Sequence, residues 1–156
     1  MQLSVLVVGR TADKAVEMLI QDYCKRLPHY YPFSFEVTES NPGKTQQHEV
    51  IRQKEGEGIL KRIQPGDWLV LLDERGKELT SEGFAEQITK WGNQSRKRVV
   101  FVVGGAFGFS EAVMERSDMK LSLSKMTFSH QIVRAIFLEQ LYRACSIIKG
   151  EPYHHS

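Results

Sequence analysis

The stretch KLSLSKMTFSHQIVRAIFLEQLYRACSIIKG occupies residues 120–150, and EPYHH follows at residues 151–155. It opens with an alternating segment, Leu121 to Leu123, that favours a strand, and then runs through a polar loop. Beyond the loop, apolar residues recur at intervals of three and four, Ser129 can cap a helix, and Lys149-Gly150 can end it. The stretch therefore predicts a strand, a loop, a long helix and a short aromatic and imidazole tail.

The predicted long helix carries two apolar stripes. The first consists of Ile132, Val133, Ile136, Phe137, Leu141, Ala144, Ile147 and Ile148. The second lies on a neighbouring face and consists of Ala135, Leu138, Tyr142 and Cys145. A surface helix of a monomer needs only one apolar face. We therefore expect the first stripe to pack on the sheet of the same chain and the second on another subunit, which predicts a homodimer.

The composition is that of a globular protein with one domain, residues 1–156. The chain is 41% hydrophobic and 26% charged, and its 156 residues are enough for a full core. No stretch reaches transmembrane length and Met1 to Gly9 is too short for a signal peptide, so we expect a cytoplasmic protein without a membrane partner. A net charge of +2 permits a nucleic acid partner without requiring one.

Predicted strands and helices alternate along the chain. The strands are expected at Leu3–Val8, Phe33–Val37, Trp68–Leu72, Val99–Val103 and Leu121–Leu123. Besides the long one, helices are expected at Ala15–Leu27, at Thr45–Ile63 with glycine interruptions, after a cap at Thr80 or Ser81, and at Ser110–Arg116. Asn41-Pro42-Gly43 predicts a turn. This alternation predicts an α/β fold with a mostly parallel sheet and flanking helices.

Three loops follow strand ends that a parallel sheet brings to one edge. They are the segment after Leu72, Gly104 to Gly108, and Leu123 to Phe128, and together they can line one pocket. The two adjacent glycines, Gly104 and Gly105, either make a tight turn or let the backbone approach a ligand. Neither GxGxxG nor a GK[ST] phosphate loop is present. An adenosine-containing ligand without a pyrophosphate fits these features.

Other chemistry finds little support. GxSxG and HExxH motifs are absent, and no metal site is expected. Cys24 and Cys145 have no metal-type spacing and are interpreted as buried free thiols. Most basic groups, Arg134 among them, are interpreted as part of a solvated surface. Arg143 is set apart because it adjoins Tyr142 on the expected interface helix.

Residues 121–134, 139–144 and 152–154, together with the Gly104-Gly105-x-x-Gly108 loop, closely resemble the RlmH family. These small SPOUT-class methyltransferases modify N3 of a pseudouridine in large-subunit (23S) ribosomal RNA. The resemblance covers the whole chain. It implies a homodimer with a C-terminal trefoil knot in which S-adenosylmethionine binds. Carried over by position, the cofactor contacts are Leu72, Gly104, Leu123, Ser124, Lys125, Met126, Thr127 and Phe128.

Catalysis requires a group that accepts or relays the proton of the pseudouridine N3. His154 is the candidate because imidazole titrates near neutral pH, Tyr153 could stack on the base or hydrogen-bond it, and Arg143 could hold a phosphate or polarise a carbonyl. The alternative is that Pro-Tyr-His is only a docking tail. Because the tail follows the expected interface helix, we expect each site to combine the cofactor loops of one subunit with the tail of the other.

RNA, carried in the ribosome, fits the exposed aromatic and arginine groups better than DNA does. Two other functions remain open from the sequence. One is methylation of a different RNA such as tRNA by the same chemistry. The other is a non-catalytic module that binds S-adenosylmethionine or RNA.

Overall fold

A computed structural model describes residues 1–40 and 47–155, so the predicted turn at Asn41-Pro42-Gly43 lies outside the described residues. The strands are β1 (Gln2–Val8), β2 (Phe33–Thr38), β3 (Trp68–Glu78), β4 (Arg98–Val103) and β5 (Met119–Ser122). The helices are α1 (Lys14–Arg26), the 3-10 turn η1 (Leu27–His29), α2 (His48–Leu60), α3 (Ser81–Asn93), α4 (Glu111–Arg116) and α5 (Ile132–Ile148). Within these residues no helix has both the length and the apolar character needed to cross a membrane.

In the described part of the chain, the five strands form one sheet in the order β2-β1-β4-β3-β5, and every pair is parallel. Strands β1 and β4 are apolar on both faces, which suits their central position. Strand β2 alternates and lies at an edge, as its pattern predicts. The predicted α/β fold with a parallel sheet and flanking helices is therefore confirmed.

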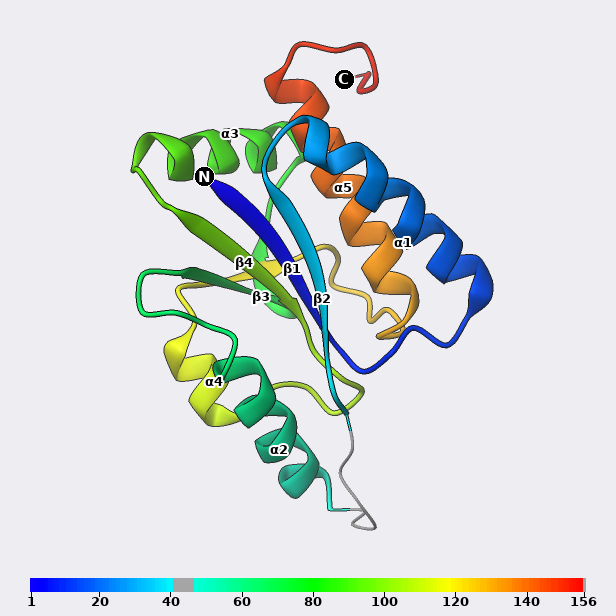
Figure 1. Ribbon diagram of the computed structural model, residues 1–156, viewed down its shortest axis with the longest axis vertical. Coiled ribbons are helices and arrows are strands. Elements are labelled where there is room, and N and C mark those ends of the chain that lie inside the picture. The colour runs from blue at the N-terminus through cyan, green and yellow to red at the C-terminus, as the bar shows by residue number, and fades with distance from the viewer. Residues whose placement is uncertain (41–46, 156) are drawn as a thin grey trace.

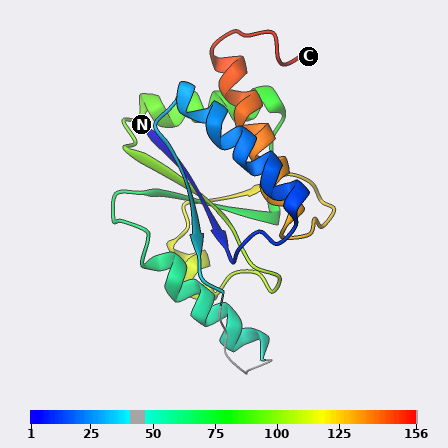
Figure 2. The same ribbon diagram turned by 45° about the vertical axis from the view of Figure 1, so that its right-hand side comes forward.

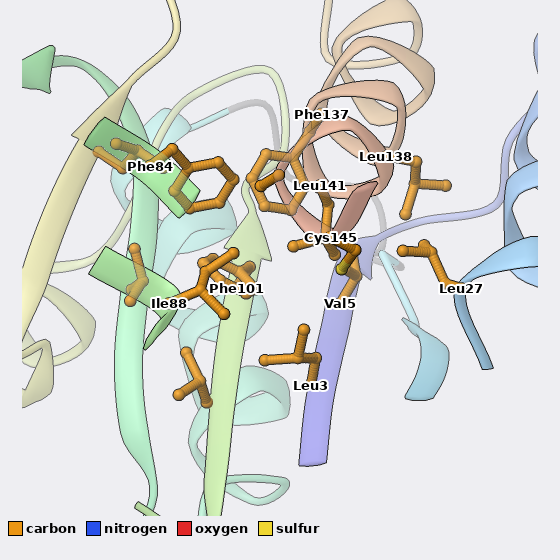
Figure 3. Packing of buried hydrophobic residues seen from close by; sticks show 14 of the residues in the cluster. Leu3, Val5, Leu27, Phe84, Ile88, Phe101, Phe137, Leu138, Leu141 and Cys145 are labelled. Atoms are coloured by element: carbon orange, nitrogen blue, oxygen red, sulfur yellow. The ribbon is translucent and has the colours of Figure 1, made fainter. Parts of the chain in front are cut away.

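Helices α1, α3 and α5 cover one face of the sheet, and α2 and α4 cover the other (Figures 1 and 2). The core under the first group contains the aromatic rings of Phe84, Phe101 and Phe137 (Figure 3). The ring centroids of Phe101 and Phe137 are 4.9 Å apart, and those of Phe84 and Phe101 are 6.0 Å apart. These contacts fix α3 and α5 against β4.

Helix α5 corrects one prediction. Ala135, Leu138 and Cys145 of the second stripe are 4%, 0% and 1% exposed, because they join the core that contains Val16, Ile20 and Leu27. Figure 3 shows Leu138 and Leu27 on the same side of that core. The prediction that this stripe packs on a second subunit is therefore wrong. The sequence pattern could not reveal that α5 lies between α1 and α3 of its own chain.

Strand β3 corrects a second prediction, because it continues past Leu72 to Glu78. Leu121 of β5 pairs with both Leu72 and Lys77, so the four residues between them bulge out of the ladder. A Cβ on Gly76 would lie 2.6 Å from the carbonyl carbon of Lys120, so only glycine fits where the bulge returns to β5. Strand β5 also begins two residues earlier than expected, at Met119.

The amino ends of β3 and β4 are joined by a buried ion pair. Asp67, whose side chain is 4% exposed, accepts hydrogen bonds from the Arg98 Nε at 2.9 Å and from the Gln64 amide at 2.7 Å. Burial would raise the pKa of Asp67, but these hydrogen bonds outweigh it and hold the pKa below its ordinary value. The pair fixes two strands whose other ends carry the candidate site.

We expect Asp67→Asn to lower the free energy of unfolding by about 3 kcal/mol at neutral pH, because it removes one partner of a buried pair. A carboxylate with a lowered folded pKa stabilises the fold above its unfolded pKa of about 4, and this stabilisation is lost as the pH falls through the folded value. Urea unfolding near pH 7 and about pH 3 should therefore give a smaller difference in unfolding free energy between the wild-type protein and Asp67→Asn at the acid pH. Equal differences would contradict this, and Asp22→Asn in an exposed pair is the control.

Candidate active site

A cavity of about 460 Å³ lies beside the bulge of β3 and the carboxyl ends of β4 and β5. Leu72 pairs with Val103 on one side and with Leu121 on the other, so the bulge of β3 and the segments that follow β4 and β5 begin at one level of the sheet. The cavity is the size of a small-molecule site. We call the segment Leu123–His130, which covers it, the cofactor loop.

The structure brings together the residues carried over for cofactor binding, with one exception. The cavity is lined by Leu72, Gly104, Leu123, Ser124, Met126, Thr127 and Phe128. Gly104 and Met126 thus face the same space although they come from segments far apart in sequence. Lys125 is exposed and does not line the cavity, so its contribution stays a prediction.

The cofactor loop is held in shape by its own polar groups. The Ser122 hydroxyl donates to the Ser124 carbonyl oxygen at 2.8 Å, and the Ser124 hydroxyl accepts from the Met126 amide at 3.0 Å. At its end, the Ser129 hydroxyl accepts from the Gln131 amide at 3.1 Å, so Ser129 helps to cap α5 although the helix itself begins at Ile132. Thr127 donates a hydrogen bond to the Glu74 carboxylate across the cavity.

The bulge of β3 adds polar residues to the cavity that the sequence did not single out as ligand contacts. Asp73, Glu74 and Arg75 all line it. The Arg75 side chain donates to Asp73, and this hydrogen bond outweighs burial and lowers the pKa of Asp73. The sequence offers little signal for this, because the adjacent acidic residues Asp73 and Glu74 after an apolar run are more typical of a loop than of a continuing strand.

Gly105, on the segment after β4, has no room for a side chain. A Cβ there would lie 2.7 Å from Oε1 of Glu55, a residue of α2 that is 6% exposed. The other carboxylate oxygen of Glu55 accepts from the Ser40 hydroxyl at 2.6 Å. The buried carboxylate therefore supports the glycine segment from behind, and the backbone itself forms the cavity wall.

The residues proposed for catalysis also lie together, at the far end of α5. Arg143 donates to Glu139 at 2.6 Å and its guanidinium lies 4.7 Å from the centroid of the Tyr153 ring. The Tyr153 hydroxyl donates to the same Glu139 carboxylate at 2.9 Å. Burial, and then this hydrogen bond, raise the pKa of Tyr153, so its hydroxyl stays protonated near neutral pH. Tyr153 is therefore a hydrogen-bond donor and not a base.

The neighbours of His154 determine its tautomer. Its Nδ1 lies 3.2 Å from an Arg143 nitrogen, and its Nε2 lies 2.9 Å from a carboxylate oxygen of Glu82 in the first turn of α3. Arginine can only donate, so Nδ1 accepts a hydrogen bond from Arg143. Nε2 therefore carries the ring hydrogen and donates a hydrogen bond to the Glu82 carboxylate. This hydrogen bond lowers the pKa of Glu82. Sequence reasoning missed both Glu82 and Glu139.

Within one chain the tail and the cavity are separate. Arg143, Tyr153 and His154 are not among the residues that line the cavity. Arg143 stands eleven residues along α5 from Ile132, roughly 16 Å at the helical rise. Figure 1 shows the C-terminal segment at the opposite end of α5 from the loop that precedes the helix. A second cavity of about 220 Å³ shares Leu121, Leu123 and Phe128 with the first and extends along α5 to Gln140.

The cysteines and the possible metal ligands give no further candidate for chemistry in the part of the chain that the structure describes. Both cysteines are free thiols, but only Cys145 is buried as predicted, whereas Cys24 is half-buried. Burial raises the pKa of Cys24 to about 11 and that of Cys145 to about 12, which disfavours the nucleophilic thiolate. In residues 1–40 and 47–155, no group of three histidine, cysteine or acidic residues lies close enough to hold a metal ion.

The donor set fits S-adenosylmethionine. Apolar side chains such as Leu72, Met126 and Phe128 suit an adenine ring, and the Glu74 carboxylate can accept from amino or hydroxyl groups or complement a sulfonium charge, whereas Asp73 is paired with Arg75. At Gly105 the backbone forms the wall, because the Glu55 carboxylate behind it leaves no room for a side chain.

Comparison with known proteins gives full-length matches. Residues 1–154 match the family model described as "Predicted SPOUT methyltransferase". The chain is 50% identical over 156 residues to the ribosomal RNA large subunit methyltransferase H of Christiangramia forsetii, and 51% identical over 160 residues to that of Parabacteroides distasonis. It is 48% identical over 156 residues to that of Bacteroides thetaiotaomicron. Each alignment covers 99% of both chains.

Gly105→Ala should weaken S-adenosylmethionine binding about 10-fold, because the added Cβ pushes either the Glu55 carboxylate or the cavity wall out of place. Isothermal titration calorimetry measures the affinity. Gly66→Ala is the matched control, since its Cβ meets no atom within 4 Å. Equal affinities of the two variants would contradict the view that the glycine backbone forms the cofactor wall.

Proposed function

The chain belongs to the SPOUT methyltransferase family, and on that premise we propose that it transfers the methyl group of S-adenosylmethionine to N3 of a pseudouridine in large-subunit (23S) ribosomal RNA. We infer that it does so as a single domain spanning residues 1–156, in the cytoplasm, where ribosomes are assembled. The observation that carries the proposal is the cavity in which the cofactor loop meets the ends of β3 and β4. The relatives match the chain over 99% of their length and are named ribosomal RNA large subunit methyltransferase H, which supports the choice of substrate.

In this proposal the cavity holds the cofactor between Leu72, the Gly104-Gly105 backbone and the cofactor loop. When bound there, S-adenosylmethionine supplies a methyl group on a positively charged sulfur. Lys125 lies in the same loop, and its contact with the cofactor is part of the proposal although it does not line the cavity. No metal takes part, since an imide nitrogen needs only positioning and loss of its proton to accept the methyl group.

A C-terminal trefoil knot belongs to the same proposal. Strand β5 lies at the sheet edge beside β3, whereas α5 begins on the far side of β4, against the end of β1. The cofactor loop must therefore cross the bulge of β3 and the carboxyl end of β4. This return path supports a passage of the C-terminal segment behind an earlier loop, which general rules of chain topology would otherwise disfavour.

His154 is proposed to accept the N3 proton through Nδ1. Glu82 holds the proton on Nε2, so Nδ1 has the free lone pair once Arg143 moves away. A phosphate or carbonyl oxygen of the RNA can draw Arg143 toward itself, which exposes Nδ1 only when substrate is present. Tyr153 keeps its proton and can stack on the base or donate to it.

The active site is proposed to form between the two subunits of a homodimer. The cofactor loops and the tail lie at opposite ends of α5, so one chain does not bring them together. Ile132, Ile136 and Gln140 form a strip on α5 that its own chain leaves partly open, and Gln140 and Ile136 also line the second cavity. We place the subunit contact on this strip, in place of the buried stripe that the sequence suggested.

Mass mapping of large-subunit RNA from cells that lack the protein tests the function. We expect loss of one methyl group from a pseudouridine and its return with the wild-type gene. An unchanged large-subunit RNA with a methyl group lost from tRNA would move the substrate to another RNA. Unchanged RNA of every kind, with S-adenosylmethionine still bound in vitro, would leave only the non-catalytic alternative.

The same cells test the shared site. We expect neither a chain truncated after Gly150 nor the Gly105→Ala variant to restore full methylation alone. When both are expressed together in equal amounts, random pairing makes half of the dimers mixed, and each mixed dimer contains one intact pair of cofactor loop and tail, so methylation should rise toward about a quarter of the wild-type level. Co-expression that stays at the level of the better single variant would argue for a site within one chain.

A further inference from the structure

Arg134 is fully buried, with 0% of its surface exposed, although sequence reasoning placed it on a solvated surface. In the described residues no carboxylate lies within ion-pair distance of its guanidinium. A buried charge normally requires a partner or a full set of hydrogen bonds. Arg134 has the second arrangement, and the groups that it binds come from two distant segments of the chain.

One of these segments is the end of β1. Arg134 Nη2 donates to the Val8 carbonyl oxygen at 2.7 Å, and Nη1 donates to the Gly9 carbonyl oxygen at 2.7 Å and to the Thr11 hydroxyl at 2.9 Å. The ladder between β1 and β4 ends at Val7, so it supplies no partner for the buried Val8 carbonyl. The guanidinium therefore caps the carboxyl end of a central strand.

The other segment is the end of the cofactor loop. Arg134 Nε donates to the His130 carbonyl oxygen at 2.9 Å, while the Arg134 amide bonds to Gln131. His130 lines the cofactor cavity. A single planar side chain thus joins a residue of the cavity wall to the rigid centre of the sheet.

Gln131, three residues earlier and on the same face of the helix turn, makes a second link to the same region. Its Oε1 accepts from the Ala12 amide at 2.7 Å, and its Nε2 donates to the Arg10 carbonyl oxygen at 3.3 Å. The segment Val8–Ala12 is therefore held from one helix turn by two side chains. Within the part of the chain that the structure describes, the rest of the cofactor loop makes only local hydrogen bonds and the Thr127–Glu74 contact.

We propose that Arg134 is a positioning residue for methyl transfer: it fastens the end of the cofactor loop to the carboxyl end of β1 and so keeps the cavity wall in its cofactor-binding shape before the cofactor arrives. The inference rests on the proposed function for the identity of the cofactor. Lysine cannot replace this arginine, because an ammonium group lacks the planar fork that reaches His130 and Val8 at once. The expected consequence is a loss of cofactor affinity greater than the loss of activity at saturating cofactor.

Two measurements on the purified full-length protein test the proposal, one of them without any cofactor. Trypsin cleavage after Lys125, which is exposed in the cofactor loop, reports how well the loop is held. We expect Arg134→Lys to increase the rate of this cleavage about 10-fold and to weaken S-adenosylmethionine binding about 10-fold, because hydrogen bonds to a charged donor are lost. KM for the cofactor should rise with little change in kcat.

Milder variants keep the test valid if Arg134→Lys folds poorly. Thr11→Val removes one acceptor of Arg134, and Gln131→Ala removes the second link. Each should raise the cleavage rate at Lys125 and the dissociation constant for S-adenosylmethionine about 3-fold. Ile88→Ala is the control for lost stability, since Ile88 is 0% exposed in α3 and does not line the cavity. It should leave unchanged both the cofactor affinity and the rate of cleavage at Lys125 relative to cleavage elsewhere in the same chain.

Wild-type cleavage at Lys125 and wild-type affinity in the Arg134 and Thr11 variants would overturn the proposal and leave Arg134 a purely stabilising residue. The same changes in Ile88→Ala would also overturn it, because they would follow from lost stability alone. If the wild-type protein bound no S-adenosylmethionine, the proposed function would fail, while the cleavage rates would still decide whether Arg134 holds the loop.

Discussion

The packing of α5 between α1 and α3 is the constraint on which the rest of the structure depends. The preceding strand β5 lies at the sheet edge, whereas α5 buries Phe137, Leu138 and Leu141 completely in the core over the central strands β1 and β4. Burial of side chains of this size stabilises the fold by about 2 kcal/mol each, which holds the helix in this position. The connecting segment therefore crosses from β5 past the bulge of β3 and the end of β4. The cavity exists because a short chain segment has to make that crossing.

Electrostatics divides the candidate site into two parts with different tasks. The cavity contains Asp73, which is paired with Arg75 and has a lowered pKa, and Glu74, which is the carboxylate that can complement a cationic cofactor. At the far end of α5, Arg143 and the imidazole and protonated phenol of the tail are linked through Glu139 and Glu82. This set is proposed to bind RNA and to accept a proton, and none of its members lines the cofactor cavity. The separation of the two sets along α5 is why the account needs a second subunit.

Much of the fold and of the cavity could be predicted because the relevant patterns are local. Continuous apolar runs marked β1 and β4, and the parallel sheet then placed the loops after its strands at one edge. Where the sequence misled, a contact distant in sequence decided the outcome. The second stripe of α5 is covered by α1, and Arg134 is buried because the end of β1 provides acceptors more than 120 positions away. The extension of β3 depends on a bulge against β5, and neither the knot nor the roles of the site residues follows from periodicity.

A crystal structure of the protein with S-adenosylmethionine tests the central claim most directly. The account predicts cofactor density between Gly104 and Met126, with the transferable methyl group facing the Tyr153-His154 segment of a second copy across a two-fold axis. Cofactor density at any other place, or a methyl group enclosed by one chain with both tails remote, would contradict it.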